Sequence, residues 1–116
     1  MNNISITIDE KIVSRWLSTR PEKLKGAVSN IINKVTLLTE RYAKILTPVD
    51  TGRLRSSISS QIRPMSSTVS THTNYARYVH DGTRYMSPRP FMRQGADQAL
   101  GQMSGIVDAE VKNALE

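Results

Sequence analysis

Residues 21–46, PEKLKGAVSNIINKVTLLTERYAKIL, carry the strongest structural signal in the sequence. Apolar side chains recur there at alternating spacings of four and three residues, the period of one face of an α-helix. The stripe consists of Leu24, Val28, Ile31, Val35, Leu38, Tyr42 and Ile45, and it is widened by Ala27, Ile32 and Leu46. The opposite side carries Lys25, Asn33, Lys34, Glu40, Arg41 and Lys44. The spacing predicts a long amphipathic helix from Pro21 to about Leu46 that packs by one face on the rest of the domain.

The chain before this helix predicts a short strand and a short helix. Residues 3–9 alternate apolar and polar side chains and are rich in β-branched Ile and Thr, which is typical of a strand with one buried face. Residues 10–18 are expected to form a short helix. Pro21 then suits the first turn of the long helix, because proline presets the helical φ angle.

The chain after the long helix predicts a turn and a β-hairpin. Residues 47–52, TPVDTG, stop the helix and turn the chain. From Arg53 to Arg63, apolar or small residues alternate with Arg, Ser and Gln, so we expect a strand with one basic face. Residues 63–67 supply a turn, and residues 68–73 predict the antiparallel return strand. The weak hydrophobicity of that strand favours an edge or a partly exposed hairpin.

The last third of the chain predicts two helices separated by an irregular linker. Residues 74–79 are expected to form one helical turn capped by Asn74, followed by a turn at residues 81–83 and a linker over residues 85–90. Pro90 then begins a final helix to about Leu115, in which Gly95, Gly101 and Gly105 suit close approach to another helix. Together these elements predict one α+β domain over residues 1–116, a small antiparallel β-sheet packed against two long α-helices.

The charge of the chain is unevenly distributed. Lys and Arg total 16 against 10 Asp and Glu, a formal net charge of +6. Residues 51–93 hold seven arginines against the single acid Asp81, and an acidic segment follows. The planar guanidinium of arginine donates paired hydrogen bonds to carboxylates and phosphates, and arginine is common at protein interfaces. Such a chain can bind nucleic acid or pair basic and acidic faces between copies, and a solvated surface with internal ion pairs is the plainer alternative.

The sequence carries no pattern typical of a catalytic, metal or cofactor site, so we expect a protein that is not an enzyme. The absence of cysteine excludes disulfides and thiolate ligands. His72 and His80 lack metal-ligand spacing, and we expect hydrogen-bonding or surface roles for both. A small hydrolase that uses His80 and Asp81 is a remote interpretation, because no serine lies in a nucleophile elbow. No apolar run approaches the length of a membrane span, which favours a soluble cytoplasmic protein.

Aromatic residues and arginines interleave between residues 75 and 93. The aromatic members are Tyr75, Tyr78, Tyr85 and Phe91, and the basic members are Arg77, Arg84, Arg89 and Arg93. This mixture can stack bases and bind phosphates, and it equally describes the anchors of a protein interface. The spacing favours neither.

Three sequence blocks resemble those of a family of small tail-completion proteins, which join head to tail in long-tailed double-stranded DNA bacteriophages. The blocks are TPVDTGRLRSSI at 47–58, NYARYVHDGT at 74–83 and RPFM at 89–92. They are similar to the family's signatures in order and spacing, and they span residues 47–92. One departure is His80-Asp81, where the family usually has an acidic residue and another residue before Gly-Thr. The segment before residue 47 is compatible in type but carries no motif.

The resemblance implies a structural virion protein at the neck, present in the host cytoplasm during assembly. It implies a ring of copies, six-fold to match the tail. The expected partners are the chain itself, head-connector proteins and tail-terminator or tail-tube proteins, with non-specific contact to passing DNA, no membrane and no cofactor. The alternative is a small basic nucleic-acid-binding module that uses the Arg and Tyr cluster.

Within these blocks we expect two classes of residue. The expected interaction residues are Arg53, Arg55, Arg77, Tyr78, Arg84 and Arg89. The expected structural residues are Pro48, Asp50, Thr51, Gly52, Leu54, Tyr75, Ala76, Val79, Gly82, Thr83, Pro90 and Phe91. Asp50 can accept backbone N–H bonds in the turn, Gly52 permits a positive φ, and Gly82 ends the short helix. Phe91 can anchor the last helix to the sheet.

Overall fold

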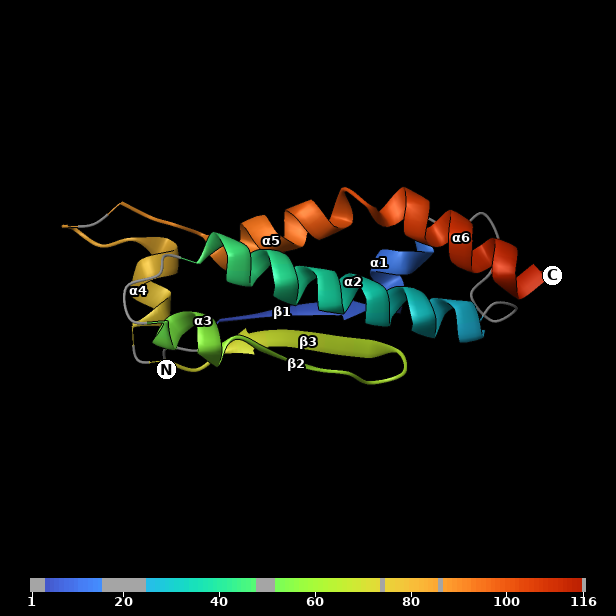
Figure 1. The fold of residues 1–116 in the computed structure, drawn as a ribbon, viewed down its shortest axis with the longest axis horizontal. Helices are drawn as coiled ribbons and strands as arrows, with labels where there is room; N and C mark the ends of the chain where they lie inside the picture. Colours follow the sequence, from blue (N-terminus) through green and yellow to red (C-terminus); the bar gives the residue numbers. More distant parts are fainter. Residues whose placement is uncertain (1–3, 16–24, 48–51, 74, 86, 116) are drawn as a thin grey trace.

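The computed structural model describes residues 4–15, 25–47, 52–73, 75–85 and 87–115. They form an elongated α+β domain of 53 × 21 × 21 Å. The elements follow in the order β1 (Ile4–Asp9), α1 (Glu10–Ser14), α2 (Lys25–Leu46), α3 (Arg53–Ser57), β2 (Ser59–Gln61), β3 (Ser66–Thr71), α4 (Ala76–Asp81), α5 (Phe91–Leu100) and α6 (Met103–Leu115). The long helix α2 lies between the sheet and the α5–α6 pair (Figure 1).

The described strands form one antiparallel sheet in the order β1-β3-β2. Ile6 of β1 pairs with Val69 of β3, and Ile8 pairs with Ser67. Paired residues share a face of the sheet, so this register places the buried side chains of both strands under the helices. The expected strand at residues 3–9 is confirmed over its described part.

Strand β3 is the central strand, so the first expected alternative, an edge strand, was wrong, whereas β2 and β3 do pair as a hairpin whose β2 strand is partly exposed. Strand β3 also begins earlier, because Ser66 and Ser67 belong to the strand rather than to the turn. The hydroxyls of its buried residues have local partners, which is why so polar a strand can lie in the middle. Ser67 Oγ bonds to both the backbone N–H and the carbonyl of Arg63, and Thr71 Oγ1 bonds to the hydroxyl of Ser57.

Helix α2 is confirmed over Lys25–Leu46; residues 21–24 lie outside the described part of the chain. Its buried face departs from the apolar stripe towards the C-terminal end, where Ile45 is 61% exposed, contrary to expectation. The buried positions there are the smaller Thr36, Thr39, Ala43 and Thr47. Each of these threonines donates its hydroxyl hydrogen bond to the carbonyl four residues earlier, at 2.5–2.8 Å. Burial therefore leaves no threonine hydroxyl of this face unsatisfied.

The expected strand at residues 53–63 is largely wrong, because residues 53–57 form the short helix α3 and only Ser59–Gln61 form a strand. Leu54 and Ile58 are four residues apart, so their apparent alternation equally fits one face of a helical turn. Both are buried, whereas Ile62 is 46% exposed. Gly52 precedes the helix with a φ of 80°, and its carbonyl accepts a 2.8 Å hydrogen bond from Ser56 Oγ. Arg53 and Arg55 therefore lie on a helix and not on a strand face.

The expected final helix is divided into α5 and α6 at residues 101–102. Gly101, which has a low helix propensity, lies at the division, where Gln102 N–H bonds to the carbonyl of Ala99, one residue short of the α-helical spacing. The buried stripe nevertheless continues across the division through Ala99, Met103 and Val107. Within the described residues, no helix is both long and apolar enough to cross a membrane.

Helix α5 approaches α2 very closely at Gly95. A Cβ atom at Gly95 would lie 2.7 Å from the backbone nitrogen of Ala43 and 2.9 Å from its Cα. The expectation that a glycine of this helix permits close helix packing is therefore confirmed at Gly95. At Gly105, by contrast, an added Cβ would meet nothing within 4 Å.

Candidate interaction surface

The three sequence blocks, which are far apart in the chain, come together at one end of the domain. The first block contributes α3, the second contributes α4, and the third begins α5 (Figure 1). The chain between α4 and α5 extends outward beyond α4 before it returns (Figure 1). We call this region the arginine end, defined by α3, α4 and residues 82–90. All six expected interaction residues lie in it.

A shared hydrophobic cluster forms the base of the arginine end. Its fully or nearly fully buried members are Ala43, Leu54, Ile58, Val69, Ala76, Phe91 and Met92, and Tyr75 and Val79 pack against them. All three blocks thus contribute buried side chains to one cluster: Leu54 and Ile58 from the first, Ala76 from the second, and Phe91 and Met92 from the third. The backbone also joins the blocks, because Arg89 N–H donates a 2.9 Å hydrogen bond to the Val79 carbonyl. Leu54, Ala76 and Phe91 are buried, and the anchoring role expected of Phe91 stays a prediction.

The glycines and Pro90 set the backbone around this cluster. Gly52 and Gly82 both have φ values of 80°, a conformation that other residues rarely adopt. Gly82 is the C-cap of α4, as expected. Pro90 is the N-cap of α5, so that helix begins one residue later than expected. Thr83 is exposed. The expected roles of Pro48, Asp50, Thr51 and the Asn74 cap fall outside the described residues.

Arg53, Arg55 and Arg77, three of the expected interface arginines, have partners within the chain. Arg55 Nε donates a 3.0 Å hydrogen bond to the Lys44 carbonyl at the C-terminus of α2, where a cation is favoured by the helix dipole. Arg77 Nε lies 3.5 Å from the carboxylate of Asp81. Both arginines remain exposed. The Arg55 contact joins α3 to α2, whereas the Arg77–Asp81 ion pair lies within α4.

Several side chains within and after α4 are exposed to solvent. Arg84 and Arg89 are exposed, Tyr78 is 53% exposed and Tyr85 is 90% exposed. The Arg84 guanidinium carbon lies 5.9 Å from the centre of the Tyr85 ring. An exposed aromatic ring beside a cation is a frequent anchor of macromolecular interfaces.

His80 has a structural role that the sequence did not reveal. Its Nε2 accepts a 3.3 Å hydrogen bond from the backbone N–H of Arg93, in the first turn of α5. Because Nε2 accepts, Nδ1 carries the proton and donates to Asp81 Oδ1 at 2.9 Å. Pro90 makes no side-chain cap, so His80 caps α5 from another helix. Its ring also packs edge-on against Phe91, with centroids 5.4 Å apart.

The hydrogen bond between His80 and Asp81 affects the ionisation of the Asp81 carboxyl. The hydrogen bond from His80, with the charge of Arg77 adding to it, lowers the pKa of the Asp81 carboxyl. The stability that results is present above the ordinary carboxyl pKa and is lost as the pH falls through the lowered value. Because Asp81 is exposed, solvent screening keeps this contribution small.

We predict that His80→Ala destabilises the chain by about 1–2 kcal/mol, because it removes the cap of α5 and a contact to Phe91. His72→Ala is the matched control. His72 is exposed and bonds to Ser70 Oγ at 3.3 Å, so its replacement should change stability by less than about 0.5 kcal/mol. Urea unfolding of the two variants measures the difference, and equal stabilities would contradict the capping role.

Other candidate sites are sparse in the described part of the chain. It holds no group of three or more His, Asp or Glu side chains able to bind a metal ion. Arg63 lies between β2 and β3, outside the arginine end. Comparison of the chain with protein-family models, with curated proteins and with solved structures found no match.

Proposed function

We propose that this chain is a non-enzymatic structural protein of a bacteriophage virion that completes the tail and joins it to the head connector. In this proposal several copies assemble as a ring at the neck, with six-fold symmetry to match the tail. The partners are other copies of the chain, head-connector proteins, and tail-terminator or tail-tube proteins. Assembly takes place in the host cytoplasm and depends on complementary surfaces, with no cofactor.

The observation that carries the proposal is the convergence of the three family-like blocks at the arginine end. Their apolar residues share one buried cluster, while their arginines are exposed around it. A rigid base with cations and tyrosines at its rim suits docking onto a protein surface, because the base needs little ordering when it binds. The described residues between α4 and α5, 82–85 and 87–90, extend outward beyond α4 and are well placed to reach a partner (Figure 1).

The exposed arginines of the arginine end are also compatible with a place at the neck, through which DNA passes. An opening lined by arginines attracts phosphates without regard to sequence. Such contact can be tolerated during DNA passage, since it is weak at physiological salt and carries no base recognition.

Imaging of lysates from a phage that lacks this gene tests the proposal. We expect DNA-filled heads and complete-looking tails that remain separate, because the joint between them is missing. Complementation with the intact gene serves as the control and should restore joined particles. Tails of irregular length would narrow the role to tail termination, whereas normal joined particles would refute a role at the neck.

A second candidate function is a nucleic-acid-binding module, favoured by the arrangement of Arg84 beside the exposed Tyr85 ring. In that case the purified chain binds DNA, and the logarithm of its affinity falls steeply with the logarithm of the salt concentration. A neck protein that meets DNA only in passing should show much weaker binding. Titration of a labelled duplex at several salt concentrations separates the two functions.

A further inference from the structure

One aromatic side chain of the arginine end is left almost wholly in solvent. Tyr85 is 90% exposed, more than any other large hydrophobic residue in the described part of the chain. A tyrosine side chain can bury about 150–250 Å² in a core or an interface, and most of that surface is the apolar ring. Tyr85 buries little of it within the chain, so nearly the whole ring is available to a partner.

The backbone holds this ring in a defined place. Tyr85 N–H donates a 3.2 Å hydrogen bond to Thr83 Oγ1. Further along, Arg89 N–H donates to the Val79 carbonyl at 2.9 Å, which ties the returning chain to α4. The protrusion beyond α4 is thus closed at its base (Figure 1). A ring that is already positioned loses less conformational freedom when it binds.

The surroundings of the ring are cationic. The arginine end, made of α3, α4 and residues 82–90, contains five arginines and one acidic residue, Asp81. The Asp81 carboxylate already bonds to His80 and pairs with Arg77. Arg84 lies 5.9 Å from the centre of the Tyr85 ring and forms no ion pair with any residue that the structure describes. Charge complementarity therefore calls for carboxylates or phosphates around the ring in the complex.

The shape of the protrusion favours a protein over a nucleic acid. Proteins that bind single strands hold them in a basic groove along which several aromatic rings stack on successive bases. Tyr85 instead lies on a segment that extends outward from the domain, and the other exposed tyrosine, Tyr78, belongs to α4 (Figure 1). A single projecting ring fits a hollow in a protein surface, where tyrosine and arginine are frequent anchors.

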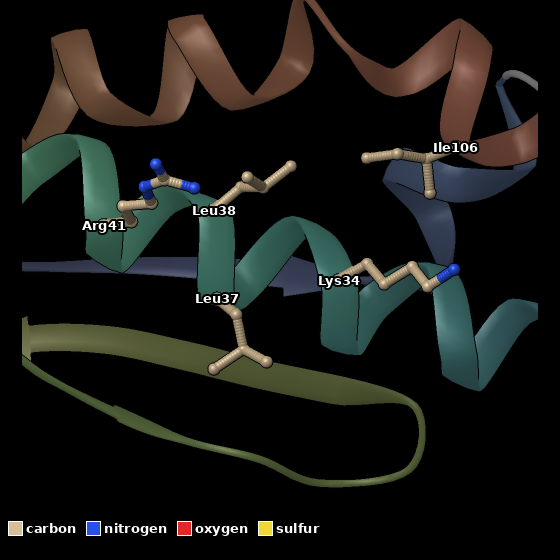
Figure 2. A pocket seen from close by; sticks show the side chains of 5 residues that line it. All are labelled: Lys34, Leu37, Leu38, Arg41 and Ile106. Carbon is tan, nitrogen blue, oxygen red and sulfur yellow. The ribbon is translucent and has the colours of Figure 1, made fainter.

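The chain itself carries a pocket large enough for a ring, but its charge does not suit Arg84. The pocket, of about 380 Å³, is lined by Lys34, Leu37, Leu38, Arg41 and Ile106. Figure 2 shows Leu38 and Ile106 extending into the space between α2 and α6. Its charged lining residues are cations, and Lys34 is already paired with Glu110. This pocket offers Arg84 no free acid, which argues against a second copy as the partner of the ring.

We propose that Tyr85 is the anchor of the docking contact and enters an apolar pocket, rimmed by carboxylates, on a protein other than this chain. Arg84 bonds to the carboxylates of the rim. The inference rests on the proposed function, in which that protein is a component of the head or of the tail. The ring supplies most of the strength of the contact, and the guanidinium supplies attraction at a distance.

The test uses heads and tails purified from the gene-deletion lysate, to which the purified full chain is added. The quantity measured is the chain concentration that gives half-maximal joining, counted by electron microscopy. Tyr85→Ala should raise this concentration at least about 30-fold, as expected for an aromatic hot spot. Tyr85→Phe keeps the ring and should stay within about threefold. Arg84→Gln should raise it about tenfold at about 50 mM salt and less at about 500 mM.

Two controls accompany these variants. Ile62→Ala truncates another exposed apolar residue, 46% exposed in the hairpin, and should join like the unaltered chain. Titration of a labelled single-stranded DNA should give the same affinity for Tyr85→Ala and for the unaltered chain, since the ring does not stack on bases. All variants should keep the melting temperature of the unaltered chain within about 2 °C, because the altered side chains are exposed.

Five other outcomes overturn the inference. Normal joining by Tyr85→Ala removes the anchor and leaves the proposed function intact. An equal loss in Tyr85→Phe places the contact at the hydroxyl, and unchanged joining by Arg84→Gln removes the acidic rim. A loss in Ile62→Ala as large as that in Tyr85→Ala shows that the effect is not specific. DNA affinity that falls tenfold in Tyr85→Ala assigns the ring to base stacking. If the unaltered chain itself fails to join heads to tails, the proposed function fails, and the inference fails with it.

Discussion

If the chain joins heads to tails as proposed, we expect Arg84→Glu combined with Arg89→Glu to abolish joining while the chain stays folded. Both side chains are exposed on the segment that extends beyond α4. The backbone hydrogen bond from Arg89 to Val79 does not involve the side chain and is retained. Reversal of two charges at a docking rim replaces attraction by repulsion, so we expect infectious titre to fall by about 100-fold or more in a complementation assay.

The control for this prediction is the same charge change outside the arginine end. Arg15→Glu with Arg63→Glu alters two exposed arginines of the N-terminal segment and the hairpin, and it should complement normally. Equal melting temperatures of the two double variants would show that neither disturbs folding. Arg55 is unsuitable for this test, because its side chain bonds to the end of α2 and its loss would also affect stability. Normal joining by the Arg84 and Arg89 variant would remove the docking role of the protruding segment.

Gly95→Ala is expected to produce the largest loss of stability from a single added methyl group. The new Cβ would lie 2.7 Å from the Ala43 backbone nitrogen, and backbone atoms cannot move without displacing α2. Overpacking costs about 1–3 kcal/mol, and here the upper part of that range applies. The better helix propensity of alanine offsets at most about 1 kcal/mol of this cost. Urea unfolding should show a net destabilisation of about 2 kcal/mol.

Gly105→Ala is the matched control, because it is the same substitution in the adjoining helix. The added Cβ has open space, so the gain in helix propensity should stabilise the chain by about 0.5–1 kcal/mol. The two variants should therefore change stability in opposite directions. A stabilising Gly95→Ala would mean that α5 and α2 do not approach as closely as the structure shows.

The amphipathic helix and the N-terminal strand could be predicted because each has an unambiguous apolar period. The secondary structure of residues 53–58 could not be predicted, because the spacing of Leu54 and Ile58 fits both a strand and a helical turn. The position of β3 in the centre of the sheet was missed for a different reason. Its serines and threonines are acceptable there only because hairpin and α3 partners satisfy their hydroxyls.

Some features of the candidate site could likewise be predicted from the sequence, and others could not. The sequence indicated an arginine-rich segment and an anchoring role for Phe91, because the residue types are themselves informative. It did not indicate the His80 cap, since the amide that His80 accepts from lies 13 residues away on another helix.

By itself, the sequence determined the α+β class, the long central helix and the concentration of arginine in residues 51–93, because periodicity and charge are local properties of a chain. Only the tertiary structure decided which faces of α2 are covered, that Gly95 is the contact with Ala43, and that three separated blocks build one end of the domain. These features depend on which surfaces meet when the whole chain packs. Burial is a property of that packing, and no local window of sequence contains it.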